Sequence, residues 1–200
     1  RWLAGNQQID GLYLDDIALK RDPSARVPAS TSAKVVPANP AATSQRAMWV
    51  WNTKKLLDPT ESGEVDRFFA FCSGNAIRTL YLAMEFNRGE EDAAPRYELR
   101  NPERYQAFLE RAHRQGLVVE GLAGTPEWGI RENHAHALAA VDAALAFHRA
   151  SPASARFDGV HFDVEPYALI GYSDPEYRTQ ILEEFLEMVS QCAARVRAEP

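Results

Sequence analysis

The sequence predicts an α/β protein that contains about the first half, four units, of a parallel (β/α)8 barrel, the TIM barrel. Two observations carry this prediction. From Arg46 onward, short apolar segments alternate with segments of helical periodicity, at about 35 to 40 residues per strand–helix unit. The last of these strands runs into Asp163 and Glu165, and the ends of barrel strands carry the active site in such folds.

Four strands and four helices follow one another in this region. We expect strands over residues 47–51, 77–84, 117–122 and 157–164, and helices over residues 61–73, 102–115, 134–149 and 175–197. Pro102 suits a first helical turn, Gly74 and Gly116 suit helix ends, and Asn133 suits an N-cap. A complete doubly wound sheet is the alternative fold. It lacks support because Asn52-Thr53-Lys54-Lys55 follows the first strand, where a glycine-rich phosphate loop would stand.

The composition is that of an ordinary globular protein. The chain has 200 residues, of which 46% are hydrophobic and 25% charged, and its net charge is −6. Lys and Arg never cluster beyond a pair, which argues against a nucleic-acid or anionic-membrane partner. Cys72 and Cys192 lie in apolar helical patterns and are expected to be buried free thiols. The sequence shows no signal pattern and no long apolar segment, so it does not determine the localisation. A secreted or periplasmic location is the one we consider.

The region before Arg46 has two parts of different composition. Residues 1–22 are interpreted as the tail of an upstream domain, and residues 23–45, rich in Pro, Ala, Ser and Thr, as a linker. Residues 46–200 then form the half-barrel, which the rest of the parent polypeptide would complete.

An internal similarity links the upstream tail to the last strand. Residues 9–16 align without gaps with residues 157–164, and both segments alternate apolar positions before an aspartate. Asp15 and Asp16 are therefore candidates for a sugar-binding site of the upstream domain. Alternatively, they cap a helix over residues 17–21.

The two faces of the strand at residues 157–164 differ in chemistry. Because side chains alternate along a strand, one face is apolar and the other ionisable. The apolar face carries Val160, Phe162 and Val164, and the ionisable face carries His161, Asp163 and Glu165.

Asp163 and Glu165 are the candidate catalytic residues. Strand rise alone sets their Cα atoms about 6.5 to 7 Å apart, so both carboxylates can reach one substrate. Two neighbouring carboxylates favour a proton on one of them, and glycoside hydrolysis needs such a pair. Alternatively, they form an inward polar layer, in which Asp163 pairs with an arginine and Glu165 binds a backbone N–H.

Aromatic, amide and acidic side chains at the strand ends predict a carbohydrate site. Pyranose rings stack on aromatic rings, and their hydroxyls need polar partners. Trp51 and Trp49 are open to a second interpretation, as barrel core, whereas Trp128 lies in a loop, which favours ligand contact. The candidate substrate-binding residues are Trp51, Asn52, Glu85, Asn87, Trp128, His161 and Tyr167.

The segment from Asp158 to Glu165, Asp-Gly-Val-His-Phe-Asp-Val-Glu, resembles the Asp-x-x-Asp-x-Asp-x-Glu signature of the family 18 chitinase-like glycoside hydrolases. It also resembles poorly characterised bacterial hydrolase-like barrels. The resemblance implies that Glu165 donates the proton and that Asp163 orients the acetamido group of the substrate. The sequence departs from the signature at His161, where the family has a third acid.

Two further possibilities concern metal and function. His134, His136 and His161 could supply three nitrogens to zinc. His134 and His136, however, are two residues apart at the start of a predicted helix, and helical side chains at that spacing do not face each other. We therefore expect no metal and no cofactor. The functional alternatives are a glycoside hydrolase and a non-catalytic carbohydrate-binding barrel in a larger secreted protein.

Overall fold

One sheet dominates the structure. The computed structural model describes residues 7–9, 12–14, 46–58, 60, 62–89 and 94–199, and of the first two segments only the strand backbone. Six strands form the sheet in the order β1-β2-β8-β7-β4-β3. Its pairs are parallel except for β1 with β2, which is antiparallel. The chain is therefore an α/β protein with four successive parallel strands joined by helices.

The four predicted strands are confirmed, with ends that shift by at most two residues. The sheet strands are β1 (Gln7–Ile9), β2 (Leu12–Leu14), β3 (Arg46–Val50), β4 (Ile77–Ala83), β7 (Val118–Ala123) and β8 (Gly159–Phe162). Strand β8 is shorter than expected, because it ends before Asp163 rather than at Val164. The Asp163 N–H still donates to the Ala123 carbonyl at 3.0 Å, so the backbone stays beside β7 for one more residue.

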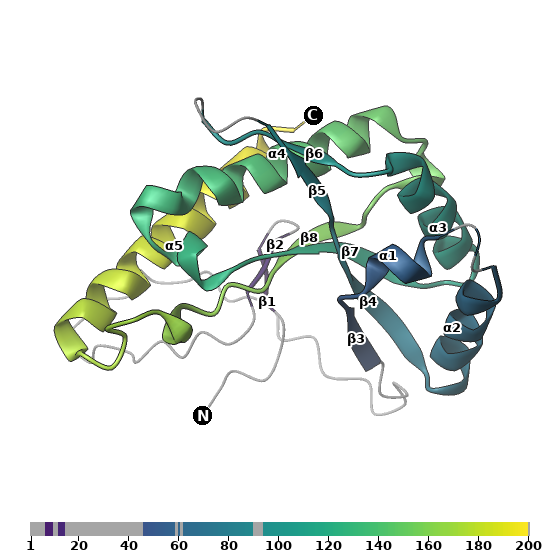
Figure 1. Ribbon diagram of the computed structural model, residues 1–200, viewed down its shortest axis with the longest axis horizontal. Helices are drawn as coiled ribbons and strands as arrows, with labels where there is room; N and C mark the ends of the chain where they lie inside the picture. The colour runs from purple at the N-terminus through teal and green to yellow at the C-terminus, as the bar shows by residue number, and fades with distance from the viewer. Residues whose placement is uncertain are drawn as a thin grey trace, which may run out of the picture.

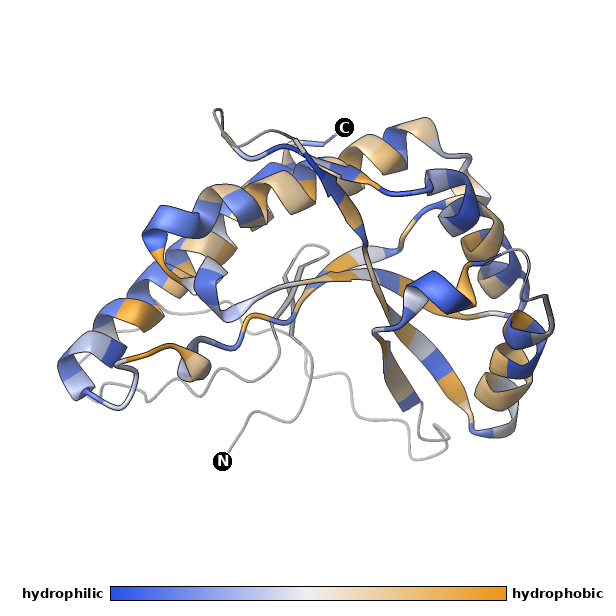
Figure 2. Cartoon of the chain, in the orientation of Figure 1, coloured by the Kyte–Doolittle hydropathy of each residue, from blue (hydrophilic) through white to orange (hydrophobic). Residues whose placement is uncertain are grey.

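The four predicted helices are also confirmed. They are α2 (Ser62–Gly74), α3 (Pro102–Arg114), α4 (His134–Ala150) and α5 (Pro175–Arg197). Figure 1 shows them in an arc around one side of the sheet. Figure 2 shows hydrophilic and hydrophobic residues alternating along α4 and α5, as expected of helices with one buried side. None of the described helices combines the length and apolar character needed to span a bilayer.

Two predicted helix ends differ in detail. Asn133 precedes α4, but its side chain makes no capping bond. Its Nδ2 instead donates to the Glu127 carbonyl at 3.0 Å. At the end of α2, Ala76 takes the left-handed conformation, with φ 57°, that we expected of Gly74-Asn75. The prediction for Gly116 is confirmed, since it has φ 72° directly after α3.

Several short elements were not predicted. They are α1 (Thr53–Leu56), the antiparallel pair β5 (Phe86–Arg88) and β6 (Tyr97–Leu99), and the 3₁₀ turns η1 (Pro126–Gly129), η2 (Arg131–Asn133), η3 (Ala153–Ala155) and η4 (Pro166–Ala168). Each is too short to show a hydrophobic period. Most of them follow the carboxyl ends of strands, so they decide which side chains reach the candidate site.

The two faces of the sheet have different neighbours. The main hydrophobic core joins one face to the helices, with strand residues such as Leu82 and Phe162 packed with helix residues such as Phe108 and Phe185. Cys72 and Cys192 are buried free thiols in the same core, as predicted. The opposite face is here called the polar face. It carries Tyr81, Glu120, Leu122, His161 and Asp163.

The segment that echoes β8 in sequence also lies beside it. Strand β2 pairs in parallel with β8, with Tyr13 opposite His161. The linker over residues 23–45, the candidate residues Asp15 and Asp16, and the helix at 17–21 lie outside the described residues. The division into an upstream tail, a linker and a half-barrel therefore stays a prediction.

Candidate functional site

Asp163 lies against the backbone of Gly124, the residue that follows β7. It is half-buried at the carboxyl end of β8 and follows the alternation of the polar face. Gly124, next to it, has φ 155°, and a Cβ atom there would overlap the Asp163 carbonyl oxygen. Glycine is therefore required at position 124, and the close contact fixes where the Asp163 side chain leaves the sheet.

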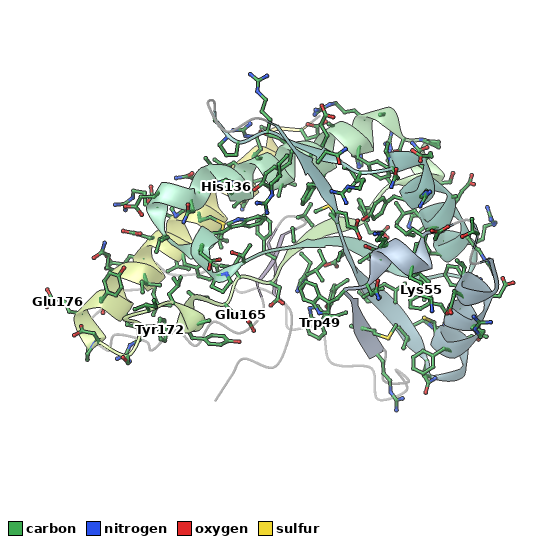
Figure 3. All side chains as sticks on the ribbon, in the orientation of Figure 1. Trp49, Lys55, His136, Glu165, Tyr172 and Glu176 are labelled. Atoms are coloured by element: carbon green, nitrogen blue, oxygen red, sulfur yellow. The ribbon has the colours of Figure 1, made fainter. Side chains whose placement is uncertain are left out.

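Glu165 lies beyond the strand, at the start of η4. Its backbone has left the extended conformation, with ψ 72°, yet its side chain is exposed while Val164 is buried, as strand alternation predicts. The Glu165 carboxylate accepts a hydrogen bond from the Tyr167 hydroxyl and caps no backbone N–H. Figure 3 shows Glu165 and Trp49 on the side of the sheet opposite α4. An exposed carboxylate with a phenol partner is accessible to a substrate.

Glu85 belongs to a polar network at the end of β4. Its carboxylate accepts a hydrogen bond from the Thr53 hydroxyl at 3.2 Å and lies 3.6 Å from the Arg100 guanidinium. The Tyr105 hydroxyl accepts from the Glu85 N–H at 3.0 Å and donates to the Ala83 carbonyl at 2.9 Å. Burial raises the pKa of Tyr105, so the hydroxyl keeps its proton for this bond. A cavity of about 90 Å³ opens beside the network.

The other predicted substrate residues differ in exposure. Trp51 is 54% exposed, which favours a binding surface over barrel core, and Asn52 is also exposed. Asn87 lies on β5, where its Oδ1 accepts from Arg100 Nε at 3.1 Å. Trp128 is only 6% exposed and packs edge-on against Phe162. Its indole ring therefore belongs to the core, and its burial does not support the predicted ligand contact.

A cluster of rings lies on the polar face. His161 is 1% exposed and stacks on Tyr81 with ring centroids 3.9 Å apart. Trp49, which is 44% exposed, contacts both rings, at 5.1 Å from Tyr81 and 6.1 Å from His161. The Trp49 ring is thus partly exposed and packs on two buried rings. The sequence had left open whether Trp49 belongs to the barrel core or to a binding surface.

Glu120 is the site residue that sequence reasoning missed. It is 3% exposed on β7, and its Oε2 lies 3.5 Å from His161 Nδ1. The signal was present, because a single acid stands in an apolar strand, at a position that alternates onto the same face as Leu122. Glu120 lies inside a strand, whereas most of the predicted site residues lie at strand ends.

The metal hypothesis fails for the three candidate histidines. His136 Nδ1 bonds the Tyr97 hydroxyl at 2.7 Å, and His161 faces Glu120. His134 is buried at the start of α4, where burial lowers its pKa. Within the described segments, no three His, Cys, Asp or Glu side chains gather in a way that could hold a metal ion.

A groove of about 670 Å³ lies elsewhere, in the helical layer. Leu56, Val65, Phe108 and Arg111 are among the residues that line it, and they belong to α1, α2 and α3. Neither Asp163 nor Glu165 lines this groove. Its size is therefore no evidence that it takes part in their chemistry.

Comparison with known proteins gives no relative. The chain matches no family model, no curated protein and no solved structure. The class of protein that the fold and site define is an α/β protein with an acidic pair after its last parallel strand. A functional assignment depends on the geometry of that site.

Proposed function

We propose that the protein is carbohydrate-active, and that it is a glycoside hydrolase with Glu165 as general acid and Asp163 as its partner. The observation that carries the proposal is the position of the two acids. They follow the carboxyl end of a parallel strand, one half-buried and one exposed. A general acid needs access to the leaving-group oxygen, and Glu165 has it.

The strand order favours half of a TIM barrel over a doubly wound sheet. Strands β3, β4, β7 and β8 are neighbours in the order of the sequence. A doubly wound sheet reverses its order at a switch point between the strands, and no reversal occurs among these four. Helices around one side of the sheet agree with a barrel wall. Further units from the parent polypeptide would close the barrel and supply the facing half of the site.

The proposed chemistry assigns separate roles to the two acids. Glu165 protonates the oxygen of the leaving group, and the Tyr167 hydroxyl holds its carboxyl group in place. Asp163, fixed by the contact with Gly124, stabilises the developing positive charge or, as the family 18 resemblance implies, orients a substrate acetamido group. Trp51 and Trp49 offer exposed rings for stacking on sugar.

Resemblance to the family 18 signature supports this proposal only in part. Asp158, its first position, lies before β8, where the carboxylate accepts the Val119 N–H at 2.7 Å and contacts His113. Asp158 thus joins the amino-terminal ends of β7 and β8 and stabilises the fold rather than the site. His161, at the position of the third acid, is buried.

A panel of chromogenic aryl glycosides, including acetamido sugars, tests the function directly. We expect the polypeptide that contains the complete barrel to release the aryl group from at least one member of the panel. Failure to cleave any aryl or natural glycoside, under conditions where the protein is folded, would contradict hydrolase activity.

The second candidate is a non-catalytic carbohydrate-binding barrel. It is favoured by His161, which stands where the related signature has an acid, and by exposed Trp49 and Trp51. Isothermal titration calorimetry with oligosaccharides separates the two functions, because this candidate predicts binding with no turnover in the unmodified protein.

A further inference from the structure

Among the described residues, Glu120 and His161 form a buried pair whose facing atoms have no other hydrogen-bond partner. Their side chains are 3% and 1% exposed, and Glu120 Oε2 lies 3.5 Å from His161 Nδ1. Neither atom has a hydrogen-bond partner among the described contacts. A buried polar atom left unpaired costs about 1 to 3 kcal/mol, so native proteins rarely keep one without a use.

Aromatic neighbours fix the plane of the imidazole. The His161 ring stacks on Tyr81 at an interplanar angle of 23°, and the Trp49 ring meets it at 80°. In this plane, Nδ1 faces the Glu120 carboxylate. The separation of 3.5 Å exceeds a normal hydrogen bond of about 2.7 to 3.2 Å by only a few tenths, so a slight approach satisfies both atoms.

We propose that Glu120 is a positioning residue of the candidate site and acts through His161. Its carboxylate accepts the Nδ1 proton of the neutral ring, which selects one tautomer and leaves Nε2 as the acceptor. His161 and Asp163 lie two residues apart on one strand face, so the ring set by Glu120 is part of the surroundings of the Asp163 carboxylate. The effect on catalysis rests on the proposed function. The preference of the His161 ring for one tautomer does not depend on that function.

Nitrogen-15 NMR of the histidine rings in the 200-residue chain tests the pair without any substrate. The chain has five histidines, and His161→Gln identifies the His161 signal by its loss. At a pH where the ring is neutral, we expect the His161 proton on Nδ1 alone. A proton on Nε2, or a mixture of the two tautomers, would overturn the proposal.

Two substitutions of Glu120 separate the hydrogen bond from the charge. Glu120→Met keeps the length of the side chain but offers no oxygen, so the Nδ1 preference should be lost. Glu120→Gln keeps one carbonyl acceptor and should retain it. Equal loss in both variants would assign the effect to charge and contradict the hydrogen bond. If neither variant folds, the tautomer in the unmodified chain decides.

Kinetics of the complete protein test the positioning role. We expect Glu120→Met to lower kcat on an aryl glycoside by roughly tenfold or more with KM nearly unchanged, because a carboxylate that sets the tautomer of an active-site histidine acts on the chemical step. The matched control is Glu183→Gln, an exposed acid on α5, which should leave both constants unchanged. An unchanged kcat in Glu120→Met would overturn the positioning role. Absence of turnover in the unmodified protein would instead refute the proposed function, and the NMR result would still decide the pair.

Discussion

Glu184 shows how a buried charge is stabilised in this protein. Its side chain is 6% exposed on α5, and its two carboxylate oxygens accept from Gln180 Nε2 at 2.9 Å and from the Arg131 N–H at 2.8 Å. The Gln180 hydrogen bond and, next, the Arg131 backbone N–H hold the pKa of Glu184 below its ordinary value. The carboxylate thereby ties the turn η2, which precedes α4, to α5.

Glu184→Leu should destabilise the chain by about 1 to 3 kcal/mol at pH 7, because it leaves the Arg131 N–H without its acceptor. The folded-state pKa of Glu184 is depressed, so its charge stabilises the fold above the unfolded-state pKa of about 4.3. This contribution is lost as pH falls through the lower folded-state pKa. Urea unfolding of both proteins between pH 7 and pH 3 should show the difference shrinking below about pH 4. A difference that stays constant with pH would contradict the role of the charge.

At the scale of elements, the seam between β7 and β8 positions the candidate acids. Gly124 lies against the Asp163 backbone. Gly129 of η1 lies close to the Pro166 ring that follows Glu165, since a Cβ atom at position 129 would stand 3.5 Å from Pro166 Cβ. Both ends of the acidic segment thus pack against the turn that follows β7.

Gly124→Ala should separate the ends of these strands. A methyl group at this φ is strained and would overlap the Asp163 carbonyl, so we expect a loss of stability greater than about 1 kcal/mol. Thermal unfolding of this variant measures the loss. Gly74→Ala is the matched control, because a Cβ atom at position 74 meets nothing within 4 Å. Equal melting temperatures for the two variants would show that the seam tolerates a side chain.

Hydrophobic periodicity in the sequence was sufficient to predict the long helices and the sheet strands. It was insufficient to predict how side chains are arranged in the candidate site. The helix over Pro175–Arg197 was predicted to the residue, because Pro175 opens it and an apolar stripe runs along it. The burial of Trp128 was not predicted, because η1, which places its ring in the core beside Phe162, is too short to show a periodic pattern. Glu120 stands out in the sequence as a single acid in an apolar strand, but its partner His161 becomes evident only when the strands are paired.

At the scale of the whole molecule, the two outer strands of the four-strand parallel region differ in how they are paired. Among the described strands, β3 pairs only with β4, whereas β8 pairs with both β7 and β2. An unpaired strand edge is a template for association between chains. In the barrel proposed above, a further strand would cover β3, and another would take the place that β2 holds beside β8.

Removing residues 1–45 should therefore increase self-association, because it uncovers β8 as well. We expect residues 46–200 alone to dimerise or aggregate at concentrations where the 200-residue chain does so less. Analytical ultracentrifugation of the two proteins measures this. A monodisperse, cooperatively melting monomer of residues 46–200 would contradict the half-barrel proposal.

The central claim is that Glu165 donates a proton to the leaving group, and one variant tests it most directly. Glu165→Gln preserves the shape of the side chain and removes the transferable proton. In the complete protein we expect this variant to bind oligosaccharide as tightly as the unmodified protein in calorimetry, and to lose about 10²-fold or more of its kcat on aryl glycosides. An unchanged kcat in Glu165→Gln would contradict the assignment of Glu165 as general acid.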